Sequence, residues 1–101
     1  MKEIEATKKI MTHLYFILRE EPQREGSFSS LQELHEKLDS RLQKLIKTDN
    51  NSSKLKTEIL ENFMMAVQWM RDKGIILYDS EDANSPLLVI KEKLIKNMAK
   101  L

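Results

Sequence analysis

The sequence predicts a mainly α-helical domain with a small β-hairpin, in the order helix, helix, helix, strand, strand, helix. Three observations predict this fold class. Apolar residues recur at helical spacing in three long segments. Only two glycines and two prolines interrupt the 101 residues, which favours long helices over a sheet of many strands. Two short apolar tetrads, at residues 75–78 and 87–90, flank a polar stretch and are typical of paired strands.

Length and composition indicate one soluble domain over residues 1–101. The chain is 41% hydrophobic and 33% charged, which is too apolar for a disordered protein. It has neither an apolar run of the roughly 18 residues that a membrane span needs nor the apolar start of a signal peptide. We therefore expect a cytoplasmic protein. Because cysteine is absent, disulfides, thiol catalysis and thiolate zinc sites are excluded.

The first helix is expected at about residues 3–20, where Ile4, Met11, Leu14 and Leu18 follow steps of three and four. The unbroken apolar run at residues 15–18 presents more than one side of this helix. We expect a second copy of the chain to cover it. The sequence thus predicts a homodimer in which residues 1–27, and the last helix with them, pack across the symmetry axis.

Pro22 and Gly26 place a turn after the first helix. Ser29 or Ser30 with Glu33 fits a capping box, in which each side chain satisfies a backbone amide, so a second helix should begin there and run to about residue 47. Its leucines also fit a heptad frame, but two heptads are too few to indicate a coiled coil, and core packing is favoured over a dimer seam.

A third helix is expected between Ser53, as N-cap, and Gly74, as a left-handed C-cap. The polar run at residues 48–52 before it is typical of a loop. The apolar positions of this third helix recur at helical spacing, and they are Leu55, Ile59, Leu60, Phe63, Met64, Val67 and Met70. This segment has the strongest helical pattern in the chain.

The chain after Gly74 allows two structures. The tetrads at 75–78 and 87–90 predict a hairpin with a polar tip, followed by a terminal helix over residues 92–101. Alternatively, Ser85 and Pro86 would start one helix that continues to the end. The hairpin is favoured, because a single strand at 75–78 would have nothing to pair with.

This order of elements resembles a winged helix, over about residues 28–91. The junction from Trp69 through Gly74 to Asp79 is similar to the passage from a recognition helix into the first wing strand, and residues 86–91 are similar to the returning strand. In layout the chain resembles small regulators of the MarR and PadR groups, in which flanking helices build a dimer. The resemblance implies duplex DNA binding by a small transcriptional regulator or a DNA-segregation adaptor.

The loop between the strands carries Asp79, Glu81 and Asp82, which phosphates repel, so it is not expected to enter a groove. Contacts are expected from the start of the third helix, where Asn, Ser, Thr and Lys side chains suit bases and phosphates. The predicted DNA-binding residues there are Asn50, Asn51, Ser52, Ser53, Lys54, Lys56 and Thr57. Lys91 and Lys93, with Lys96 and Lys100 further along the terminal helix, could hold the flanking backbone. Alternatively, 50–53 are only a turn with an N-cap, and the lysines are only solvated.

No pattern predicts an enzyme, a cofactor or a metal site. The sequence has no glycine-rich phosphate loop and no serine elbow, and His13 and His35 lack partners at ligand spacing. Trp69 and its neighbouring methionines favour a core position over a ligand groove. The net charge of +1 and the acidic loop favour an alternative function: a protein-binding adaptor with the same fold and no direct contact with DNA.

Overall fold

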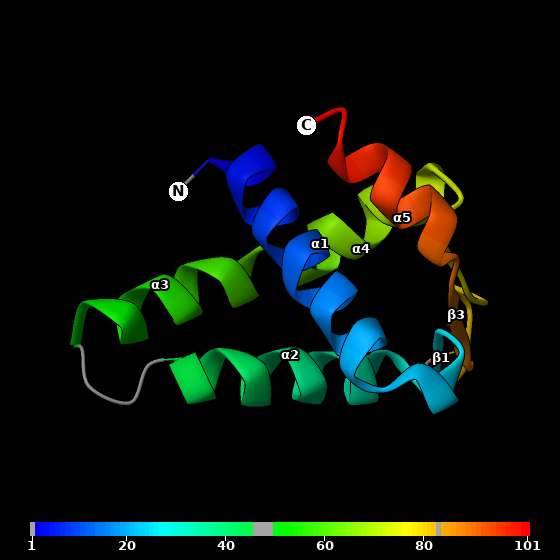
Figure 1. The fold of residues 1–101 in the computed structure, drawn as a ribbon, viewed down its shortest axis with the longest axis horizontal. Helices are drawn as coiled ribbons and strands as arrows, with labels where there is room; N and C mark the ends of the chain where they lie inside the picture. The colour runs from blue at the N-terminus through cyan, green and yellow to red at the C-terminus, as the bar shows by residue number, and fades with distance from the viewer. Residues whose placement is uncertain (1, 46–49, 83) are drawn as a thin grey trace.

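A computed structural model describes the backbone of residues 2–45, 50–82 and 84–101, and the side chains of 2–44, 54–82 and 84–101. The described part is mainly helical and carries a small three-stranded antiparallel sheet. Helix α1 (Glu3–Glu20) runs through the middle of the molecule and packs against all the other helices, which Figure 1 shows arranged around it. No helix in these ranges has both the length and the apolarity to cross a membrane.

The bounds of α1 confirm the first predicted helix, but its apolar run is covered within the chain. Ile17 and Leu18 are buried, and Tyr15 and Phe16 are half-buried against neighbouring elements. Arg41, in α2 (Leu31–Leu45), stacks over the Phe16 ring, with its guanidinium carbon 5.0 Å from the ring centroid. The observation that led to the predicted homodimer therefore does not hold for this run, and the dimer stays a prediction.

The turn after α1 contains a short 3-10 helix (Pro22–Arg24) and a strand, β1 (Ser27–Phe28), that the sequence pattern did not predict. Glu25 and Gly26 both adopt left-handed backbone conformations, with φ of 52° and 81°. These two residues redirect the chain so that β1 reaches the sheet. Arg24 braces the turn through ion pairs with Glu21 and Glu33.

Helix α2 (Leu31–Leu45) starts where the capping box predicts it. The backbone amide of Glu33 donates to Ser30 Oγ at 3.2 Å, while the Glu33 carboxylate accepts bonds from the backbone amide and the hydroxyl of Ser29 at 3.3 and 3.0 Å. The reciprocal bond of the box thus comes from Ser29 rather than Ser30. The described helix is continuous, and Leu34, Leu38 and Leu42 are buried in the core, as the core alternative predicts.

The predicted third helix is two helices, α3 (Asn50–Glu61) and α4 (Phe63–Asp72), so the expectation of one helix from Ser53 to Gly74 is wrong. The break lies at Asn62, whose side-chain amide donates to the Glu58 carbonyl at 2.9 Å and competes with the helical bonds there. The Asn62 carbonyl then accepts the first bond of α4, from Ala66 at 2.9 Å. Because α3 already begins at Asn50, Ser53 is not its N-cap and residues 50–52 are not a loop.

Strands β2 (Ile76–Leu77) and β3 (Leu87–Val89) pair antiparallel with Ile76 opposite Val89, which confirms the predicted hairpin. The alternative of one helix from Pro86 is wrong, because the terminal helix α5 (Lys91–Met98) begins only after β3. Gly74 has a φ of 73° and ends α4 as predicted. Strand β1 pairs with the other side of β3, so the strand order is β1-β3-β2.

The sheet buries one face and exposes the other. Phe28, Ile76, Leu87 and Val89 are buried, whereas Leu77 and Leu88 are 48% and 42% exposed. The inner residues join the apolar side chains of α1, α2 and α4 in a single core. Burial of apolar area contributes about 25 cal/mol per Å², so this shared core is the main source of stability. The core also fixes α5 beside α1.

Candidate nucleic-acid interface

The predicted contacts at the start of α3 are only partly described. The backbone of Asn50, Asn51, Ser52 and Ser53 lies in the first turn of α3, but their side chains are outside the described residues. Lys54 is exposed. Thr57 is also exposed, and it takes part in an interaction within the chain.

Lys56 makes two polar contacts within the fold. Its Nζ lies 2.6 Å from Asp39 Oδ1 and donates to Gln43 Oε1 at 2.8 Å, and both partners belong to α2. The ion pair and the hydrogen bond hold α3 against α2. A phosphate would have to compete with both for this ammonium group.

Lys91 and Lys93 begin α5 and point to different neighbours. Lys91 Nζ lies 5.8 Å from the centroid of the Tyr15 ring on α1. Lys93 Nζ lies beside Gly74, 3.1 Å from the place that a Cβ on Gly74 would occupy. That position follows the last turn of α4, where backbone carbonyls favour a cation.

The structure does not bring the two predicted groups of DNA-binding residues together. Figure 1 shows the beginning of α3 at the end of the molecule away from the sheet, whereas α5 follows directly from β3. Lys54 and Lys91 are therefore separated by the body of the domain. A single straight DNA duplex that contacts both the start of α3 and the start of α5 does not fit this arrangement.

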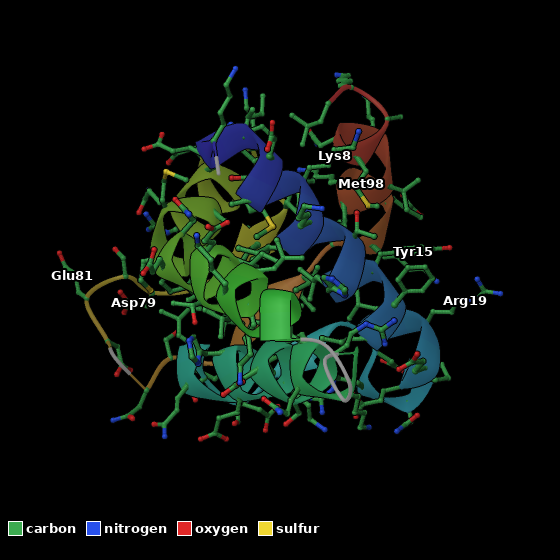
Figure 2. The ribbon with its side chains drawn as sticks, turned by 90° about the vertical axis from the view of Figure 1, so that its left-hand side faces the viewer. Lys8, Tyr15, Arg19, Asp79, Glu81 and Met98 are labelled. Atoms are coloured by element: carbon green, nitrogen blue, oxygen red, sulfur yellow. The ribbon has the colours of Figure 1, made fainter. Side chains whose placement is uncertain are left out.

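Exposed cations also lie on α1 and α5, the two helices that pack against each other. We call this group the basic face, and it consists of Lys8, Arg19, Lys91, Lys96 and Lys100. Lys8 and Arg19 lie on the same side of α1, because their spacing corresponds to about three turns of 3.6 residues. Figure 2 shows Lys8, Tyr15 and Arg19 following one another along α1, with Met98 of α5 beside them. All five side chains are exposed.

The cations of the basic face form no ion pair within the part of the chain that the structure describes. The ion pairs that are present lie elsewhere, where the end of α1 and the following turn meet α2, and where α2 meets α3. Glu92 is the carboxylate side chain of α5, among four lysines in residues 91–101. The basic face therefore keeps most of its positive charge available to a solvent anion.

Negative charge gathers on another side. Asp79, Glu81 and Asp82 are exposed in the loop between β2 and β3. Figure 2 shows Asp79 and Glu81 on the opposite side of the molecule from Tyr15 and Arg19. The described residues of this loop form hydrogen bonds with one another, including one from the Asp79 amide to Ser85 Oγ at 2.9 Å. A polyanion on the basic face would not meet this loop.

Lys8 and Arg19 were not among the predicted binding residues, because the prediction for the first helix used only its apolar side. A signal for them was present, since Lys8, Tyr15 and Arg19 keep helical spacing along the polar side of that helix. What the sequence does not contain is the position of α5 beside this row. Only that packing places Lys91 next to Tyr15.

His13 takes part in a contact between helices. Its Nδ1 accepts a hydrogen bond from Arg41 Nε at 3.2 Å, and Arg41 also pairs with Glu20 at 2.8 Å. Burial, together with the positive charges of Arg41 and Lys9, lowers the pKa of His13 below its ordinary value. Among the described residues, no group of three or more His, Asp or Glu is placed to hold a metal ion.

The methionines of α4 are divided between core and surface. Met70 is buried and Met65 is half-buried, as the core prediction requires, but Met64 is 56% exposed. Trp69 is half-buried under Lys73, whose Nζ lies 5.6 Å from the ring centroid. The exposure of Met64 is a departure from the expected core position.

Comparisons of the chain with protein-family models, with curated proteins and with solved structures found no match.

Proposed function

We propose that this chain is a winged-helix-like domain that binds duplex DNA through its basic face, as a small regulator or a DNA-segregation adaptor. The observation that carries the proposal is the separation of charge on the surface. Exposed cations without ion-pair partners gather on α1 and α5, while the carboxylates of the β2–β3 loop lie on the opposite side.

The element order supports the winged-helix part of the proposal. Helices followed by the β2–β3 hairpin and a last helix form the order on which the winged-helix resemblance is based, and the three-stranded sheet is compatible with it. The layout departs from the pattern in the helix that precedes the hairpin. α4 takes that place, and its exposed residues Met64, Gln68 and Asp72 include no cation that would read a base or bind a phosphate.

Electrostatics supports contact with the DNA backbone rather than with base edges. The side chains of the basic face are lysines and one arginine on two packed helices, and such cations bind phosphates without sequence information. Five phosphate contacts would give a slope of log K against log salt of about −4.5. Sequence selectivity would then depend on further contacts, and the predicted ones at the start of α3 stay a prediction.

The experiment compares two charge reversals of equal size. Lys91→Glu with Lys96→Glu changes the basic face, and Lys44→Glu with Lys54→Glu makes the same change in charge beside the start of α3. Affinity for a duplex is measured at several salt concentrations by fluorescence anisotropy. We expect the first variant to lower affinity at low salt at least tenfold and to reduce the salt slope by about 2.

The second variant decides between the two surfaces. Duplex binding that survives Lys91→Glu with Lys96→Glu but is lost in Lys44→Glu with Lys54→Glu would move the site back to the start of α3. Binding by neither the unchanged protein nor the variants, at low salt, would refute the proposal. Circular dichroism of each variant shows whether the helices are retained.

The alternative function, a protein-binding adaptor without direct DNA contact, is favoured by a different observation. The surface of α4 and the β2–β3 loop carries exposed Met64 together with carboxylates, which suits a protein partner and not a phosphate backbone. Absence of duplex binding at low salt would favour this alternative.

A further inference from the structure

A groove lies where α2, α3 and α4 meet, on elements that do not contribute to the basic face. It has a volume of about 310 Å³, and Leu31, Leu60, Phe63 and Met64 form its apolar lining. His35 stands edge-on to Phe63, with ring centroids 4.9 Å apart. Met64, at 56% exposure, lies on the surface at the first turn of α4. This groove is an apolar surface that the chain itself does not cover.

Negative charge borders the groove. Glu61 is among its lining residues, and the lining contains no Lys or Arg. The exposed row along α4 continues from Met64 through Gln68 to Asp72, at helical steps of four. Gln68 donates to the Asp72 carboxylate at 2.9 Å and holds it in this row. One carboxylate, Glu61, thus lies at the groove beside Met64, and a second, Asp72, lies about two helical turns further along α4.

The basic face has the opposite character. Ile95 is 45% exposed on α5, and Lys91 and Lys96 lie beside it on the same helix. Met98 and Tyr15, both half-buried, extend the apolar centre toward α1. Glu92 is exposed one turn before Ile95, so two ammonium groups and one carboxylate surround this apolar side chain, on a helix that lies at one side of the molecule (Figure 1).

We propose that the groove of one copy receives α5 of a second copy, so that the chain associates head to tail. Ile95 of one molecule would contact Met64 of the next, and Lys91 and Lys96 would approach Glu61 and Asp72. Charge complementarity between two surfaces of the same chain is the reason for choosing a second copy. The groove and α5 belong to different elements, so each molecule can use both surfaces at once.

Two physical properties follow from this geometry. The contact joins two different surfaces, so it does not close on itself as a two-fold dimer would, and it allows chains of more than two molecules. A single helix in a small groove buries less than the roughly 1,200 Å² of a standard interface, so the association is weak and transient. It also covers part of the basic face, so duplex DNA would compete with it.

The test is sedimentation velocity over a range of protein concentrations at low and high salt, without DNA. The unchanged protein should show an average mass that rises with concentration at low salt and falls back toward the monomer at high salt. Met64→Gln and Ile95→Gln each remove one apolar contact without changing the charge. Each variant alone should remain monomeric at every concentration.

Mixing the two variants gives the decisive measurement. The Met64→Gln protein retains an unchanged α5, and the Ile95→Gln protein retains an unchanged groove, so one intact contact can form between them. The mixture should give a dimer and nothing larger. A mixture that stays monomeric, an unchanged protein that stays monomeric at the highest concentration, or variants that associate like the unchanged protein would each overturn the inference.

This outcome is separable from that of DNA binding. Met64→Gln changes no residue of the basic face, so at protein concentrations too low for self-association its affinity for a duplex should equal that of the unchanged protein. Loss of self-association with unchanged duplex affinity supports the head-to-tail contact by itself. Self-association in a protein that binds no duplex would leave this inference standing and refute only the proposed function.

Discussion

Gly26→Ala is expected to destabilise the fold far more than a glycine substitution at a turn ordinarily does. Gly26 has a φ of 81°, and an added Cβ would lie 2.4 Å from the carbonyl oxygen of Val89 in β3. That oxygen belongs to the backbone and cannot move independently of the strand. The contact lies beside the hydrogen bond from the Val89 amide to the Gly26 carbonyl, which measures 2.8 Å.

The magnitude follows from two contributions. A left-handed conformation costs a residue with a Cβ roughly 1–2 kcal/mol. Separating β1 from β3 enough to relieve the clash removes the bond between Val89 and Gly26, which contributes about 0.5–1.5 kcal/mol and leaves polar groups poorly satisfied. We expect a loss of about 1.5–3.5 kcal/mol in the free energy of unfolding. That loss is a large part of the roughly 5–15 kcal/mol that stabilises a domain.

Gly74→Ala is the matched control. Gly74 is also left-handed, with a φ of 73°, but an added Cβ would meet only the flexible end of Lys93, at 3.1 Å. This variant should lose about 1–2 kcal/mol, from backbone strain alone. Urea denaturation followed by circular dichroism measures both values. Equal losses in the two variants would refute the argument that β1 is fixed by close backbone contact with β3.

Three further predictions rest on other contacts. Because the pKa of His13 is lowered in the folded protein, the unfolded chain binds more protons at acidic pH. The contribution of His13 to stability should therefore be complete above about pH 6.5 and fall as the pH drops below it. Melting temperatures from pH 5 to 8 should show this trend, and His13→Gln should flatten it. Arg24→Met should lower the free energy of unfolding, measured by urea denaturation, by about 1–3 kcal/mol. The substitution removes two ion pairs and the guanidinium that stacks over Phe28 at 4.6 Å. A change near zero would show that these pairs are only surface contacts. Asp79→Lys should leave the affinity for duplex DNA unchanged, because the loop faces away from the basic face, and stronger binding in anisotropy measurements would place the loop near phosphates instead.

Local patterns predicted the elements whose cause is local. The bounds of α1, the cap at the start of α2 and the left-handed Gly74 depend on residues within a few positions of one another. The hairpin also followed from the chain alone, because the apolar tetrads and the polar stretch between them allowed few other partners. The division of the third helix did not follow, since the apolar period continues through Asn62 without a gap.

The predicted binding residues show the same limit. The sequence identified Lys56 by its type and its place near a helix start, but could not show that Asp39 of α2 already pairs with it. It identified Lys91 in a basic tail, but not its position beside Tyr15 and the row of Lys8 and Arg19. The apolar run at 15–18 was correctly identified as needing cover, and the helices that cover it belong to the same chain.

By itself, then, the sequence determined a mainly helical domain, a first helix that must be covered, and a hairpin with an acidic tip, because periodicity, caps and glycine conformations act over short distances. The tertiary structure alone decided that Ser27–Phe28 is a third strand, that the apolar run of α1 is covered by its own chain, and that Lys8 and Arg19 lie on the opposite side from the acidic loop. These features depend on contacts between segments far apart in the sequence, and packing into one core selects among such contacts where local pattern cannot.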